Sequence, residues 1–177
     1  MSFIVVQYVV FFVLLVLLAS VVGNGIYKVM AGKKVMLTRI LAPIEQAVYR
    51  LIGVDEEEQM DAKSYALAVV QFSLAGFVGL WMLLMFQGFL PLNPEGKAGM
   101  SWDLALNTAA SFITNTNWQA YAGEVSLSYL SQMLGLTVQN FLSAAVGLAV
   151  LFAVIRGLVL KESKAIGNFW KDLTRAV

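Results

Sequence analysis

The stretch SWDLALNTAASFITNTNWQAYAG, residues 101–123, joins a helix-forming run to a cluster of polar side chains in a chain that is otherwise strongly apolar. Ser101 suits a helix N-cap, and Asp103 lies in the first turn, where a negative charge is favoured. The helix predicted over 101–114 rises only about 20 Å, which is short of a bilayer core of roughly 30 Å. Amides and hydroxyls then crowd the positions that follow it: Thr114, Asn115, Thr116, Asn117 and Gln119.

The composition predicts an all-α membrane protein. Of the 177 residues, 59% are hydrophobic and 13% are charged, and the mean hydropathy is +0.76. The absence of cysteine and histidine removes disulfides, thiol and imidazole catalysis, and the usual transition-metal sites. The net charge is only +1, and the sequence has no cluster of basic residues interleaved with aromatic ones, so nothing in it indicates nucleic-acid binding.

Four segments are expected along the chain. They are an N-terminal transmembrane helix (1–23), a cytoplasmic or interfacial loop (24–64), a membrane-pore-membrane repeat (65–160) and a cytoplasmic tail (161–177) that is basic and amphipathic. The first apolar run is about 20 residues long, as one crossing requires. No Lys or Arg precedes it, whereas a signal peptide begins with a positively charged region, so we expect a retained helix.

The loop 24–64 contains two predicted helix boundaries. A short amphipathic helix along the membrane surface is expected, with Pro43 at its first position and Gly53 as its C-terminal cap. Asp55 is interpreted as the N-cap of the next helix, with Glu58 three residues further on. A cation site in this acidic run is the less favoured alternative.

The repeat 65–160 is read as a span (65–89), a re-entrant pore helix (101–114), a polar filter segment (114–119) and a second span (126–160). Irregular backbone at membrane depth must be enclosed by protein or face water. The carbonyl end of the half-helix, with carbonyl, amide and hydroxyl oxygens after it, suits a monovalent alkali cation better than a divalent one, which prefers clustered carboxylates. The alternative is a polar hairpin at the outer surface.

Two further patterns concern the second span and the orientation. Small and polar residues recur there at helical spacing, and they indicate either helix packing or the wall of a hydrated pathway. They are Ser128, Gln132, Gly135, Gln139, Ser143 and Gly147. Eleven of the twelve Lys and Arg residues lie in 24–63 or 156–177, so the positive-inside rule predicts a cytoplasmic C-terminus and an external N-terminus.

The motifs SWDLALNTA, TNTNWQ, LSQM and GLTVQNFLSAA are long and specific. With them, the whole chain closely resembles the KdpA family, the potassium-binding A subunit of the bacterial Kdp potassium-transporting ATPase. The resemblance implies four potassium-channel-like repeats whose loops jointly form a selectivity filter. It also implies that Thr114, Asn115, Thr116 and Asn117 line the ion path for K⁺ and that Gln119 influences potassium affinity, with no cofactor beyond the transported ion.

The resemblance also implies partners and a location. These are a KdpB-like P-type ATPase subunit that hydrolyses ATP, KdpC-like and KdpF-like subunits, and the bacterial inner membrane. A single repeat would supply one quarter of a filter ring, so we expect a fragment or truncated form of a non-catalytic, ion-selecting pump subunit. The alternatives are a non-transporting interaction or regulatory protein and a short channel-like homologue that oligomerises. An intramembrane enzyme is disfavoured, because no pair of acids lies within the predicted spans.

Overall fold

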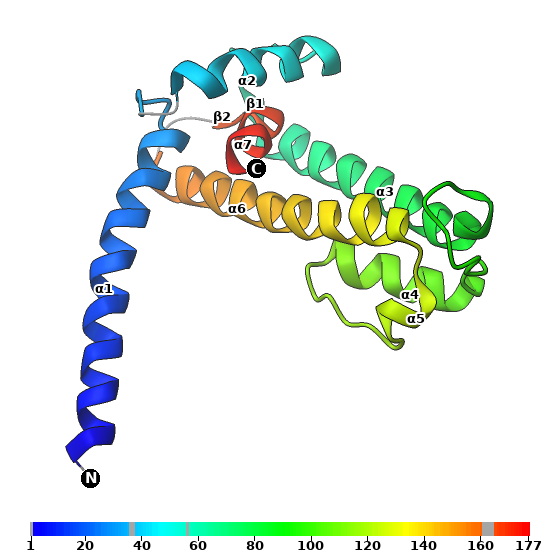
Figure 1. Ribbon diagram of the computed structural model, residues 1–177. Coiled ribbons are helices and arrows are strands. Elements are labelled where there is room, and N and C mark those ends of the chain that lie inside the picture. Colours follow the sequence, from blue (N-terminus) through cyan, green and yellow to red (C-terminus); the bar gives the residue numbers. More distant parts are fainter. Residues whose placement is uncertain (1, 36–37, 56, 161–164) are drawn as a thin grey trace. The chain divides into compact units, whose positions relative to one another are not determined.

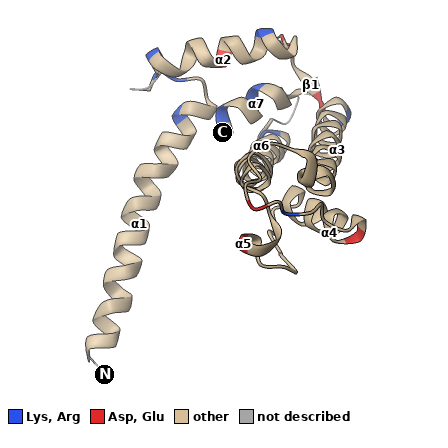
Figure 2. Cartoon of the chain, turned by 45° about the vertical axis from the view of Figure 1, so that its right-hand side comes forward, with Lys and Arg blue, Asp and Glu red and all other residues tan. Residues whose placement is uncertain are grey.

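The computed structural model describes residues 2–35, 38–55, 57–160 and 165–177. Two compact units divide the chain, Met1–Gly53 and Val54–Val177. Among the described residues, three helices are long and apolar enough to cross a membrane: Phe3–Met30, Ala62–Phe89 and Ser131–Val159. Figure 2 shows that most of their length carries no charged residue. The predicted all-α membrane fold is therefore confirmed.

The first unit consists of two helices, α1 (Ser2–Met30) and α2 (Thr38–Ile52). α1 continues well past the predicted end at residue 23. α2 begins before Pro43, which lies inside the helix, so the prediction that Pro43 is its first residue was wrong. The apolar stripe extends upstream through Ile40 and Leu41, so the amphipathic pattern continues on both sides of the proline, which costs the helix one backbone hydrogen bond. Gly53 has a φ of +68°, which confirms it as the C-terminal cap.

The second unit begins with β1 (Met60–Asp61), which pairs antiparallel with β2 (Ala165–Gly167). The helix α3 (Ala62–Phe86) follows β1 and continues into a 3₁₀ turn, η1 (Gln87–Phe89). Asp61 caps α3, because its Oδ1 accepts a hydrogen bond from the Ser64 N–H at 2.8 Å.

Asp55 is therefore not the N-cap of α3, and that prediction was wrong. Its Oδ1 accepts the Glu57 N–H at 2.9 Å and closes a local turn. Asn168 donates its side-chain amide to the carbonyl oxygens of Asp55 and Glu58, at 3.2 and 3.0 Å. This contact spans more than a hundred residues, so no local capping pattern could reveal it.

The remaining elements of the second unit are helical. They are α4 (Trp102–Ile113), α5 (Gly123–Ser126), the π-helical segment η2 (Ser131–Thr137), α6 (Val138–Val159) and α7 (Phe169–Ala176). Figure 1 shows α3 and α6 side by side, with α4 packed against both toward one end and α7 toward the other.

Two apolar cores hold the second unit together, one toward each end of the α3–α6 pair. The core around α4 contains Leu80, Leu84, Ala105, Ala109, Phe112, Leu127 and Leu136. The core under α7 contains Tyr65, Ala68, Ala145, Ala149, Ala153, Phe169 and Leu173. Alanines on α6 at a spacing of four keep one side of that helix small, so α7 and α3 can approach its backbone closely.

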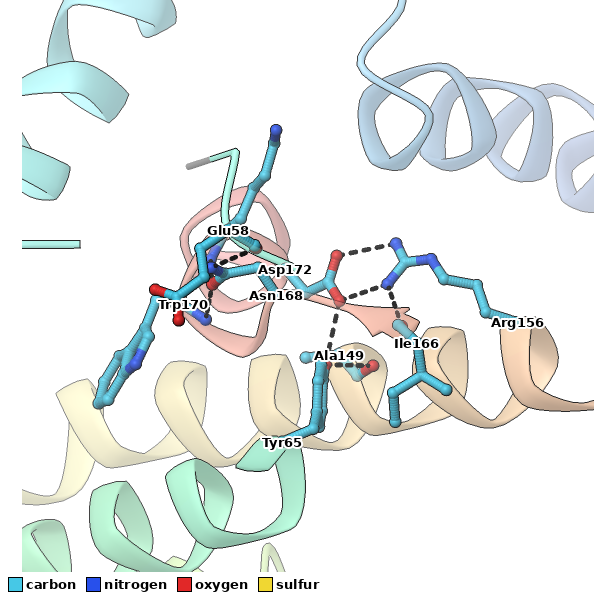
Figure 3. A network of polar contacts seen from close by, with 9 residues as sticks. Glu58, Tyr65, Ala149, Arg156, Ile166, Asn168, Trp170 and Asp172 are labelled. Carbon is cyan, nitrogen blue, oxygen red and sulfur yellow. Dashed lines mark hydrogen bonds and ion pairs between the residues drawn. The ribbon is translucent and has the colours of Figure 1, made fainter. Parts of the chain in front are cut away.

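A buried polar network fixes α7 to the two spans (Figure 3). The Asp172 carboxylate accepts hydrogen bonds from both terminal nitrogens of Arg156, at 2.5 and 2.8 Å. The Tyr65 hydroxyl lies 3.1 Å from Asp172 Oδ2 and 2.9 Å from the Ala149 carbonyl oxygen. Arg156 also donates to the Ile166 carbonyl at 3.2 Å. Of the predicted tail, residues 161–164 lie outside the described residues, and the rest is folded onto α3 and α6.

Candidate functional site

The half-helix α4 confirms the sequence prediction of a short helix between two spans. Its twelve residues rise about 18 Å, which is less than a bilayer core. Ser101 and Thr114 occupy the two cap positions. Ala105 and Ala109 are fully buried, so α4 lies close to its neighbours, and the Trp81 indole N–H donates to the Trp102 carbonyl at 3.2 Å.

The backbone of the polar turn after α4 is tied to the last turn of that helix. Five consecutive N–H groups, from residue 114 to residue 118, donate back to it. The Thr114 N–H donates to the Ala110 carbonyl at 3.1 Å, and the Asn115 N–H donates to the Phe112 carbonyl at 3.3 Å. The N–H groups of Thr116 and Asn117 both donate to the Ser111 carbonyl, at 2.9 and 3.1 Å. The Trp118 N–H donates to the Ser111 side-chain oxygen, Oγ, at 2.5 Å. Ser111 is buried and accepts three of the five bonds through two oxygens.

This pattern decides where the carbonyl oxygens of the turn point. In a trans peptide the C=O of one residue is antiparallel to the N–H of the next, and the chain has no cis peptide. Because the N–H groups of 115–118 point at the end of α4, the carbonyls of Thr114, Asn115, Thr116 and Asn117 point away from it. Along the described chain, these four carbonyls accept no hydrogen bond.

Asn115 and Asn117 allow this backbone path. Both have a φ of +57°, in the left-handed region, while the intervening Thr116 does not. Asparagine is among the few non-glycine residues that adopt this conformation readily. The two asparagines are therefore needed for their backbone conformation as well as for their amide oxygens.

The side chains of the predicted site lie together in this turn but differ in their contacts. Thr114 Oγ1 donates to the Ala110 carbonyl at 2.9 Å and lies 3.0 Å from Thr116 Oγ1. Asn115 Oδ1 lies 3.3 Å from the Ser143 hydroxyl of α6 and 3.5 Å from the amide nitrogen of Asn117. All five predicted residues are exposed.

Gln119 stands apart from the other four predicted residues. Its amide donates to the Tyr121 hydroxyl at 3.2 Å, beyond the part of the turn that is tied to α4. Ser111 is the residue that sequence reasoning missed. A serine three positions before the polar run was its only signal, and it is indistinguishable from an ordinary helical serine.

The oxygens and the helix end at the turn make it a candidate site for a cation. The C-terminal end of α4 carries a partial negative charge, and the oxygens around it are neutral. Among the described residues there is no cluster of three or more carboxylate, imidazole or thiol groups that could hold a metal ion. The turn can offer carbonyl oxygens from one side, which is the ligand type that replaces the hydration shell of an alkali ion.

Gln87 joins the loop before α4 to the segment that follows the turn. It is fully buried, and its amide nitrogen donates to the carbonyls of Ala98 and Ser126, both at 2.8 Å. Its Oε1 accepts the Ser128 N–H at 3.1 Å. Gly99 lies close to the Met85 carbonyl, and a Cβ there would overlap that oxygen. These contacts of Gln87 and Gly99 form a tightly packed frame around the turn.

The polar stripe of the last span does not form one continuous side. In the predicted span 126–160, Ser128 lies before the helix begins, and Gln132 and Gly135 lie in the π-helical segment η2, where the α-helical spacing does not hold. Gly135 packs on Leu80 and Leu83, while Gly147 is exposed, and a Cβ there would meet no other side chain within 4 Å. Helix packing thus accounts for Gly135.

The fold and the turn define a class: an all-α membrane protein in which a short helix between two long apolar helices ends in a polar turn with backbone oxygens that accept no hydrogen bond. Within that class, the chain belongs to the family described as the potassium-transporting ATPase A subunit, KdpA, whose model matches residues 9–177.

Three similar proteins share the name "Potassium-transporting ATPase potassium-binding subunit". The protein of Listeria monocytogenes serotype 4a (strain HCC23) is 61% identical over 175 residues, which cover 99% of this chain and 31% of the relative. That of Clostridium perfringens (strain ATCC 13124) is 56% identical over 177 residues, covering 100% and 30%. That of Clostridium botulinum (strain Alaska E43) is 54% identical over 173 residues, covering 98% and 30%. The chain spans about a third of the length of these relatives.

Proposed function

We propose that residues 114–119 form one segment of a potassium-selective filter, in the ion-binding and non-catalytic part of an ATP-driven potassium uptake pump. The observation that carries this proposal is the orientation of the four carbonyls of residues 114–117, away from α4 and without hydrogen-bond donors. The name shared by the relatives, a potassium-binding subunit, supports the choice of ion.

The turn would act by replacing water around the ion. Neutral carbonyl oxygens compensate for lost hydration without the strong attraction of a carboxylate, so an ion can enter and also leave. The partial negative charge at the end of α4 adds a favourable field. One turn supplies oxygens from one side, so other segments of the same kind complete the ring in the working assembly.

The assembly we propose is a complex in the bacterial inner membrane. A KdpB-like subunit hydrolyses ATP, and KdpC-like and KdpF-like subunits complete the complex. The N-terminus lies outside and the C-terminus in the cytoplasm, because the basic residues gather in 24–63 and 156–177. External K⁺ then meets the filter before it enters the membrane pathway.

Two substitutions of Asn115 in the complete pump test whether backbone oxygens bind the ion. Asn115→Gly removes the side-chain amide but keeps the left-handed backbone, and we expect potassium uptake close to that of the unchanged pump. Asn115→Val cannot adopt this backbone without strain, and we expect a loss of potassium affinity. Uptake is measured over a series of external K⁺ concentrations. Equal losses for glycine and valine would show that the amide is the required ligand and would refute the backbone model.

A further inference from the structure

The helix α2 of the first unit has a sharply divided surface. At 100° per residue, its aliphatic side chains occupy one side and its two arginines the opposite side. The aliphatic side consists of Ile40, Leu41, Ile44, Val48, Leu51 and Ile52. Leu51 is 87% exposed and Ile44 57%, and Ile40, Leu41 and Ile52 are exposed as well. A row of this size in contact with water is costly, so a non-aqueous surface covers it in the working protein.

The connection to α1 limits which surface this can be. α1 has the length and hydropathy of a membrane span and ends at Met30, eight residues before the first residue of α2. Eight extended residues reach at most about 28 Å, so α2 stays near the membrane surface at which that end of α1 emerges.

The charge of the region selects the kind of membrane surface. Residues 28–53 contain Lys28, Lys33, Lys34, Arg39 and Arg50 and one acid, Glu45, so five positive charges and one negative charge leave a net +4. Basic residues beside an amphipathic helix attract anionic lipid headgroups. Arg39 and Arg50 lie opposite the aliphatic side, where they can reach phosphates while that side is immersed.

We propose that α2 lies flat in the headgroup region of the bilayer, with Ile44 and Leu51 immersed at the acyl boundary and the flanking basic residues bound to anionic lipids. The helix then fixes the membrane depth of the adjoining end of α1. This inference stands independently of the filter, because it rests on residues of the first unit alone.

The chain contains no cysteine, so single-cysteine spin labels report on one position each. The complete chain carrying Ile44→Cys or Leu51→Cys, with Gln46→Cys as the matched variant on the polar side, is reconstituted into phosphatidylcholine vesicles with and without phosphatidylglycerol. Collision with dissolved oxygen and with a water-soluble nickel chelate is then measured. In the phosphatidylglycerol vesicles, we expect the oxygen-to-nickel ratio at 44 and 51 to be several-fold higher than at 46.

Two results would overturn the immersion of α2. A ratio at 44 and 51 equal to that at 46 places the helix in water, and labels shielded from both reagents place its aliphatic side against protein. The role of anionic lipid is tested with Arg39→Gln and Arg50→Gln together in the Ile44→Cys chain. We expect this change to lower the oxygen-to-nickel ratio of the label, which means a smaller depth in the bilayer, only in phosphatidylglycerol vesicles. An equal shift, or none, in both vesicle types would refute headgroup binding.

Discussion

Replacing Asp172 by asparagine tests whether the buried ion pair holds α7 onto the spans. In the folded chain the Asp172 side chain is 4% exposed and that of Arg156 25% exposed, and two hydrogen bonds of 2.5 and 2.8 Å join them. Removing one partner of a buried pair costs about 3–5 kcal/mol of unfolding free energy. Because Arg156 keeps some contact with solvent, we expect the lower end, about 3 kcal/mol. For a chain of this size that corresponds to a midpoint of thermal unfolding lowered by about 6–12 °C.

The assay is thermal unfolding in detergent micelles followed by tryptophan fluorescence. Trp170 is a local reporter, because its ring lies 6.1 Å from that of Phe72 and 5.1 Å from that of Phe169. Glu57→Gln is the matched control, since the Glu57 carboxylate is 85% exposed and lies 3.9 Å from the Lys171 amine. We expect that change to cost less than about 1 kcal/mol.

A double-mutant cycle with Arg156→Gln isolates the interaction of the pair from the rest of each side chain. We expect the combined loss to be smaller than the sum of the two single losses by about 1 kcal/mol or more. Additive losses, or an Asp172→Asn loss no larger than that of the Glu57 control, would refute the conclusion that this ion pair anchors α7.

The remaining predictions concern the frame and the turn. Gly99→Ala places a Cβ against the Met85 carbonyl, and we expect a stability loss of about 1–3 kcal/mol in thermal unfolding. Asp61→Ala removes the cap of α3, and we expect it to lower the midpoint of thermal unfolding. The backbone hydrogen bond from Ser64 lowers the pKa of the Asp61 carboxyl, so its contribution to stability is complete above about pH 4 and is lost as the pH falls through the lowered pKa. The difference in midpoint between the variant and the unchanged chain should therefore disappear at low pH. Ser111→Ala removes one acceptor of the turn, and in the complete pump we expect weaker potassium affinity in uptake assays. Gln119→Arg places a fixed cation beside the proposed filter and should reduce uptake most at low external K⁺.

The helical architecture could be predicted because its signals are local. Apolar length located the spans, and a run too short to cross located α4. The start of α3 could not be predicted, because Asp55 and Asp61 are both plausible caps. The choice between them depends on β1 pairing with β2 and on Asn168, which lie a hundred residues further along.

The position of the polar turn after α4 could be predicted, but the contacts of its individual oxygens could not. A run of amides and hydroxyls after a half-helix indicated a cation-binding turn. The Thr114 hydroxyl instead returns to the Ala110 carbonyl, while the backbone carbonyls are left without donors. That division depends on the position of Ser111 relative to the turn, which no spacing rule specifies.

The π-helical segment η2 has a consequence for which length changes the last span can accept. A π turn holds one residue more than an α turn, and one residue corresponds to about 100° of helix rotation. Ser128, just before the helix begins, is held by Gln87, while Ser143 further along the span lies beside Asn115 in the turn. Because the π turn takes up its extra residue within one turn, a one-residue deletion inside η2 would return the segment to regular α geometry and leave Ser143 facing the turn. The same deletion in α6 before Ser143 would instead rotate Ser143 away from Asn115 by about 100°.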